Sequence, residues 1–123
     1  MQQTTGLGRD EKLARNQALF REVNERISGL ASAFGLPDRQ LDLICECSDE
    51  TCTSTIKVPV DEYELVRTFP ARFVIYPRHD VPQIENIVGS GRGYEVVEKF
   101  GDAATLVADL DPRARVAATG GDG

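Results

Sequence analysis

Residues 45–52 read Cys45-Glu46-Cys47-Ser48-Asp49-Glu50-Thr51-Cys52 and contain all three cysteines of the chain. Cys45 and Cys47 end a predicted strand, and residues two apart on a strand project from the same face, so they can bind one ion. The polar residues that follow favour a turn that brings Cys52 back to the same point. The only histidine, His79, would supply a fourth ligand from a later segment. Three thiolates and one imidazole form a closed tetrahedral set, which is typical of structural Zn²⁺ sites.

Other interpretations of these four residues remain open at this point. The same ion could be bound with water or a carboxylate in place of His79. A disulfide with one free thiol is a second alternative, although thiols stay reduced in the cytosol. An iron–sulfur cluster, or buried cysteines without a ligand, are the remaining ones. The favoured interpretation is a structural Zn²⁺ bound by Cys45, Cys47, Cys52 and His79.

Length and charge limit the class of protein. A chain of 123 residues with 41% apolar residues suits one domain with a modest core that a metal would help to stabilise. The start of the chain has no secretory signal and no apolar run is long enough to span a membrane, so we expect a cytoplasmic protein. Residues 1–40 carry six basic and five acidic side chains, whereas residues 41–123 carry eight and fifteen. This acidic excess makes general binding to nucleic acids unlikely.

A long helix is predicted from Asp10 to about Phe34, ended by Gly35 and Pro37. Apolar residues recur along it at alternating steps of three and four, with Asn16 in one place of the series: Leu13, Phe20, Val23, Ile27, Leu30 and Phe34. This heptad pattern is typical of an amphipathic helix that packs on its own sheet. It also fits a short coiled coil between two chains, in which Asn16 would fix the register.

Together with this helix, the pattern of residues 41–110 predicts an α+β domain. The long helix packs on a small antiparallel sheet of two hairpins, with short helices and a zinc knuckle. Strands and helices alternate with turn signals, and a glycine loop at 89–93 joins the second hairpin without the lysine of a phosphate-binding loop. The predicted strands span 41–47, 53–58, 72–76, 84–88 and 94–100, and the short helices 61–67 and 102–110. We expect a disordered N-terminus over 1–9, one zinc-binding domain over 10–111 and a disordered tail over 112–123.

The order of these motifs resembles that of a group of small actinobacterial proteins of uncharacterised function. The resemblance covers roughly residues 16–113 and rests on Asn16 to Ile27, the Cys-x-Cys-x₄-Cys triplet, Glu62-Tyr63, Arg72-Phe73-Val74, His79 and Val97-Glu98-Lys99. It implies a shared metal site at Cys45, Cys47, Cys52 and His79, and no activity. Members usually have glycine before the histidine, where this chain has Arg78.

The favoured functional hypothesis is a non-enzymatic module that acts in protein–protein interaction or regulation. A closed Zn²⁺ site leaves no position for a catalytic water, and the only histidine is taken as a ligand. The expected partner is another protein or a second copy, bound through the Leu13–Phe34 helix. Three alternatives are a thiol-based redox sensor, a nucleic-acid-binding regulator using its arginines, and a zinc hydrolase with Glu46 or Asp80 as the base.

Overall fold

The computed structural model describes residues 6–34 and 40–113, and its fold is the predicted α+β class. One long helix precedes five short strands and two short helices. The elements are α1 (Gly6–Ala33), β1 (Gln40–Ile44), β2 (Thr55–Pro59), α2 (Val60–Arg67), β3 (Arg72–Ile75), β4 (Glu85–Gly91), β5 (Tyr94–Lys99) and α3 (Gly101–Asp109).

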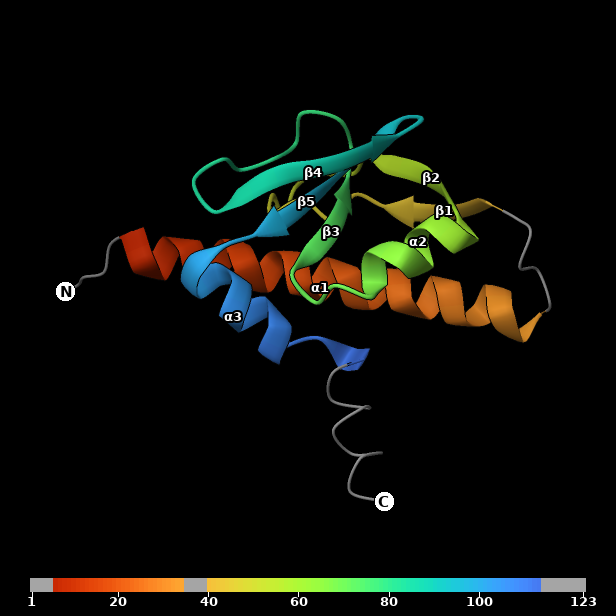
Figure 1. Cartoon of the computed structure of the whole chain (residues 1–123), viewed down its shortest axis with the longest axis horizontal. Coiled ribbons are helices and arrows are strands. Elements are labelled where there is room, and N and C mark those ends of the chain that lie inside the picture. Colours follow the sequence, from red (N-terminus) through yellow and green to blue (C-terminus); the bar gives the residue numbers. More distant parts are fainter. Residues whose placement is uncertain (1–5, 35–39, 114–123) are drawn as a thin grey trace, which may run out of the picture.

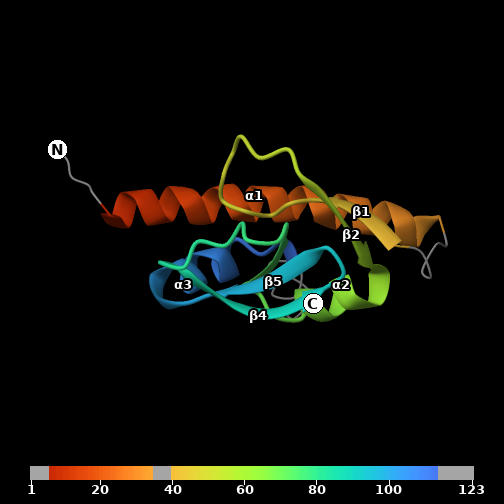
Figure 2. The same cartoon turned by 90° about the horizontal axis from the view of Figure 1, so that it is seen from above.

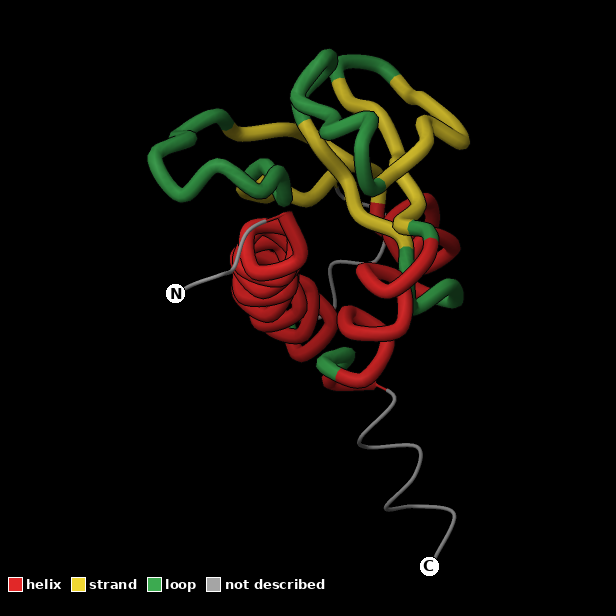
Figure 3. The backbone as a smooth tube through the Cα atoms, turned by 90° about the vertical axis from the view of Figure 1, so that its left-hand side faces the viewer, coloured by secondary structure: helices red, strands yellow, loops and turns green. Residues whose placement is uncertain are grey.

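Helix α1 runs along the whole length of the molecule; in Figure 1 the strands lie above it and α3 below it, and Figure 3 shows that one flank of α1 is not covered by the described elements. Its 28 residues span about 42 Å at 1.5 Å per residue. Strand β1 and helix α3 contact α1 directly, and α3 crosses it near its N-terminal half (Figure 1). The chain is therefore organised around one helix, with strands and short helices as its cover.

The strands form two antiparallel sheets rather than one. Strands β1 and β2 make a two-stranded sheet in which Leu43 faces Ile56. The second sheet has the order β3-β5-β4, so β3 pairs with the outer edge of the β4–β5 hairpin. The glycine loop is shorter than predicted, because β4 continues through Gly91 and only Arg92 and Gly93 remain for the turn. Gly93 has φ 86°, a left-handed conformation that favours glycine.

Strands β3 and β5 of the second sheet are buried on both faces, whereas β4 is mostly exposed, and the two buried faces divide the core into two clusters. Val74 and Val96 belong to the cluster that faces β1, β2 and α2. Phe73, Ile75 and Val97, on the opposite face, pack with Ala14 and Val107 from the helices and with Cys45 and Cys47. Two of the cysteines are thus part of a hydrophobic cluster, and a metal there would lie at its border.

The buried face of α1 differs from the predicted apolar seam. Its fully buried positions include the polar residues Gln17, Arg21, Asn24 and Ser28, next to Ala14 and Ala18. At 3.6 residues per turn this face is rotated by roughly a third of a turn from the seam. Of the seam, Ile27 packs against the core, whereas Val23, Leu30 and Phe34 are exposed. The prediction that the heptad series packs on the sheet is therefore wrong for Val23, Leu30 and Phe34.

Hydrogen bonds to distant segments explain why polar side chains occupy the buried face. Arg21 donates to the carbonyl oxygens of Pro70 (2.5 Å) and Val107 (2.8 Å). Gln17 donates to the Glu85 carboxylate (3.2 Å). A buried polar group is tolerated when it is bonded, so these contacts replace apolar packing. Hydrophobic periodicity cannot reveal such buried polar positions, because it records only where apolar residues repeat.

Both predicted ends of the domain also differ from the structure. Helix α1 begins at Gly6, so residues 6–9, predicted to be disordered, are helical. At the other end, Arg113 lies in the predicted tail but donates to Glu25 (2.6 Å) and Glu64 (2.9 Å), which fixes its position. The remaining predicted disorder, at 1–5 and 114–123, lies outside the described residues. Within the described part, no helix has the length and apolar character needed to cross a bilayer.

Candidate metal centre

The cysteine loop joins β1 to β2 and passes beside the middle of α1 (Figure 2). Strand β1 ends at Ile44, earlier than the predicted Cys47, because the chain changes partners there. The N–H of Cys45 still bonds to Ser54 O (3.0 Å) opposite, but the N–H of Glu46 bonds to Val74 O (2.9 Å) of β3. The strand alternation survives this change, so Cys45 and Cys47 share one side and Glu46 takes the other.

A turn at Asp49 returns Cys52 to the other two cysteines. The Asp49 carboxylate accepts bonds from the Thr51 N–H (2.9 Å) and the Thr51 hydroxyl (2.7 Å). The Cys52 N–H donates to Asp49 O (3.0 Å). Aspartate favours turns because its side chain can accept from the backbone two residues on. The polar residues between the cysteines therefore form the turn expected from the sequence.

His79 reaches the cysteines from a second turn, formed by Tyr76, Pro77, Arg78 and His79. The His79 N–H donates to Tyr76 O (3.1 Å). Proline in the second position and a positive φ in the third are the features of a type II turn, and Arg78 has φ 68°. The Tyr76 N–H also donates to Cys45 Sγ (3.1 Å). This turn thus orients the histidine and supports one thiolate.

The four predicted ligands come together as a compact group. One donor atom from each of Cys45, Cys47, Cys52 and His79 lies within 4.8 Å of all the others. His79 Nδ1 is 3.5 Å from Cys45 Sγ and 3.6 Å from Cys52 Sγ. A tetrahedral Zn²⁺, with Zn–S of about 2.3 Å and Zn–N of about 2.0–2.1 Å, separates sulfur from nitrogen by about 3.6 Å. The donor set and its spacing therefore fit a Zn²⁺ ion.

Hydrogen bonds polarise the two buried thiols in opposite directions. The bond from Cys45 lowers the pKa of Cys47 to about 5, against burial, and the Asp49 N–H and His79 act in the same direction. The same thiol–thiol contact, together with burial, raises the pKa of Cys45. Thiolate is the form that binds metals, so the lowered pKa of Cys47 favours the form that a metal needs.

Three polar side chains hold the cysteine loop in place. Asn24 of α1 accepts from the N–H of Ile44 (3.0 Å) and donates to its carbonyl oxygen (2.9 Å). Asn16, eight residues earlier on the helix, donates to Ser48 O (3.2 Å). The Glu46 carboxylate accepts from Asn24 (2.8 Å) and from the Val74 N–H (2.9 Å). The helix therefore fixes the backbone on both sides of Cys45 and Cys47.

These supporting residues were assigned other roles from the sequence. Asn16 was considered as a residue that sets coiled-coil register, and the structure gives it a bond within the chain. Glu46 was considered as a hydrolytic base, but it is fully buried and both of its carboxylate oxygens accept hydrogen bonds. Burial raises its pKa to about 7, against the bonds from Asn24 and Val74. The spacing of Asn16 and Asn24 on one helix face is the signal that could have revealed their role.

Replacement of Arg78 by glycine should stabilise the protein. A left-handed conformation costs a residue with a side chain about 1–2 kcal/mol, whereas glycine adopts it freely and loses roughly 0.5–1 kcal/mol more entropy on folding. We expect Arg78→Gly to raise the free energy of unfolding by about 0.5–1 kcal/mol in urea titrations. The bond from the backbone N–H of residue 78 to Glu95 (2.9 Å) is retained. Arg92→Gly is the control, because Arg92 has no positive φ, and an equal gain there would contradict the explanation.

Comparisons with family models, with curated proteins and with solved structures found no match to this chain. The metal centre is therefore assigned from its own geometry.

Proposed function

We propose that this chain is a zinc-stabilised, non-enzymatic module that acts in protein–protein interaction or regulation. The observation that supports this most is the closed donor set, in which three thiols and one imidazole lie within 4.8 Å of one another. Four protein ligands complete the tetrahedral shell of Zn²⁺ and leave no position for a reactive water. The ion would then join the cysteine loop, which follows β1, to the turn that follows β3.

The surface proposed for binding a partner is the outer stripe of α1, defined as Leu19, Val23, Leu30 and Phe34. Their side chains are 59%, 40%, 60% and 75% exposed. The residues follow one another at steps of four and seven, so they lie along one side of the helix. One flank of α1 is not covered by any element of the described residues (Figure 3), and the exposure of these four residues agrees with a position on that flank. An uncovered apolar stripe of this kind is typical of helices that dock on a protein or on a second copy.

Two substitutions in the outer stripe test this role. We expect Leu30→Glu with Phe34→Glu to abolish self-association or partner binding, because both place a charge in an apolar contact. Sedimentation velocity at tens of micromolar and affinity capture would compare the variant with the wild type. The control is Leu65→Glu, which changes an exposed apolar residue on α2. The proposal would be contradicted if the wild type is monomeric and the variant captures the same proteins as the wild type.

A further inference from the structure

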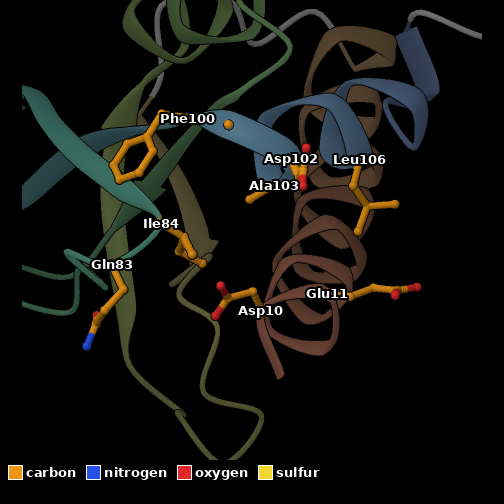
Figure 4. Close-up of a pocket in the computed structure, with 9 residues that line it drawn as sticks. Asp10, Glu11, Gln83, Ile84, Phe100, Asp102, Ala103 and Leu106 are labelled. Atoms are coloured by element: carbon orange, nitrogen blue, oxygen red, sulfur yellow. The ribbon is translucent and has the colours of Figure 1, made fainter. Parts of the chain in front are cut away.

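A cavity of about 430 Å³ lies outside both the metal centre and the outer stripe. It opens to solvent and is lined by the N-terminal part of α1, the segment before β4, the residue after β5 and the start of α3 (Figure 4). Its size is within the usual range of about 300–1,000 Å³ for small-ligand sites. The residues that matter for its chemistry are Asp10, Ile84, Phe100, Asp102, Ala103 and Leu106.

The walls of this cavity are mostly apolar. Ile84 is buried, at 4% exposure, and Ala103 and Leu106 are half-buried on α3. Phe100 exposes 44% of its surface, and its ring lies on the same side of the cavity as Ile84 (Figure 4). An apolar group of a ligand could therefore replace water against Ile84, Ala103 and Leu106, and the Phe100 ring would remain accessible at the side.

Two of the three carboxylates at the cavity, those of Asp10 and Asp102, have no cation of their own among the described residues. Asp10 points towards Ile84, whereas Glu11 points away (Figure 4) and pairs with Arg15 (3.1 Å). Within residues 6–34 and 40–113, neither Asp10 nor Asp102 forms an ion pair. Asp10 acts electrostatically on Lys99, but the Lys99 ammonium is fully buried against Glu85 (2.5 Å). The cavity thus combines apolar walls with unneutralised negative charge.

We propose that this cavity binds an arginine side chain of a partner protein, together with an apolar residue next to it. The guanidinium group is planar, can form paired hydrogen bonds to a carboxylate and can stack on an aromatic ring. Asp10 and Asp102 supply the carboxylates and Phe100 the ring. The apolar neighbour lies against Ile84, Ala103 and Leu106.

The described part of the chain already places a guanidinium on an aromatic ring twice, once together with a carboxylate pair. The Arg72 guanidinium lies 3.8 Å from the centre of the Phe69 ring and also pairs with Glu98 (2.6 Å). Arg21 lies 4.5 Å from the centre of the Phe73 ring. The net charge of −6 adds a long-range attraction for a basic partner.

A blocked peptide of sequence Gly-Leu-Arg-Leu-Gly is the probe, and the same peptide with citrulline in place of arginine is its control. Citrulline keeps the shape of the side chain and removes its charge. In an NMR titration at low salt we expect the arginine peptide to bind with a dissociation constant on the order of 1 mM and to shift the amides of residues 84 and 100–106. The citrulline peptide should bind about tenfold more weakly, because its bonds to the carboxylates are no longer charge-assisted.

Two variants locate the binding. Asp10→Asn with Asp102→Asn should weaken the arginine peptide about tenfold or more. Asp61→Asn with Asp109→Asn removes the same net charge at other exposed sites and should leave the affinity nearly unchanged. Absence of shifts at the cavity, equal binding of the citrulline peptide, or equal weakening by the two double variants would overturn the inference. These residues are neither metal ligands nor part of the outer stripe, so such a failure would leave the proposed function standing.

Discussion

Removal of the metal ligands is expected to unfold this protein. We expect the purified chain to hold about one Zn²⁺, and Cys47→Ser to lose both the ion and the folded structure. Binding of structural Zn²⁺ contributes on the order of 10–16 kcal/mol in small zinc domains, whereas a whole domain is stable by only about 5–15 kcal/mol. Cys45 and Cys47 belong to the second core cluster, so loss of the ion would leave unliganded thiol groups and a loosened loop next to Phe73 and Ile75.

Elemental analysis and thermal unfolding followed by circular dichroism measure this effect. Thr53→Ser is the control, because residue 53 is exposed beside Cys52 and is not in the ligand set. His79→Ala should behave like Cys47→Ser, since His79 Nδ1 faces two of the sulfurs at 3.5 and 3.6 Å. If folded His79→Ala keeps the ion at full stability, the fourth position is open to water and the closed structural site is wrong. A stable wild type without metal would also contradict it.

Replacement of the buried Arg67 should cost about 3–5 kcal/mol of unfolding free energy. Its guanidinium pairs with Asp111 (2.5 Å) and Glu25 (3.0 Å), and its side chain is fully buried. Arg67→Ala leaves the buried Asp111 carboxylate without its cation, whereas Glu25 keeps its pair with Arg113. An unpaired buried charge is costly. Burial opposes the charge of Arg67, but the bond to Asp111 and the charge of Glu25 hold the pKa of Arg67 above its ordinary value. The pairing therefore outweighs desolvation at this site.

Urea titrations would compare Arg67→Ala with Lys57→Ala. Lys57 pairs with Asp42 at 2.6 Å, but the two side chains are 68% and 74% exposed, so its loss should cost less than about 1 kcal/mol. Arg67→Ala with Asp111→Ala should cost less than the sum of the single variants, because the second change removes a carboxylate that the first leaves unpaired. Equal effects of Arg67→Ala and Lys57→Ala would contradict the assigned role.

The same network predicts a loss of stability in acid. The pKa of Glu25 lies below its ordinary value of 4.5, because bonds from Arg113 and Tyr63 outweigh the effect of burial. A carboxyl with a lowered folded-state pKa stabilises the protein fully above its unfolded-state pKa. That stabilisation is lost as the pH falls through the folded-state value. Glu25→Gln should therefore reduce the change in stability between pH 6 and pH 3.

The sequence by itself determined the α+β class, the order of the elements and the four residues that come together at the candidate metal centre. These features depend on local chemistry. Alternation along a strand places Cys45 and Cys47 on one side, Asp49 forms the turn to Cys52, and Pro77 takes the second position of the turn that presents His79. Each can be read from a few neighbouring residues.

Only the tertiary structure decided which face of α1 is buried, that β3 joins the edge of the β4–β5 hairpin, and where the acidic cavity lies. Hydrophobic periodicity indicates where apolar residues repeat, but a polar side chain can be buried if a distant group bonds to it. Arg21, for example, depends on Val107, which lies 86 residues later in the chain. Such partners are brought together only by the fold, so no local pattern in the sequence of α1 could predict its buried face.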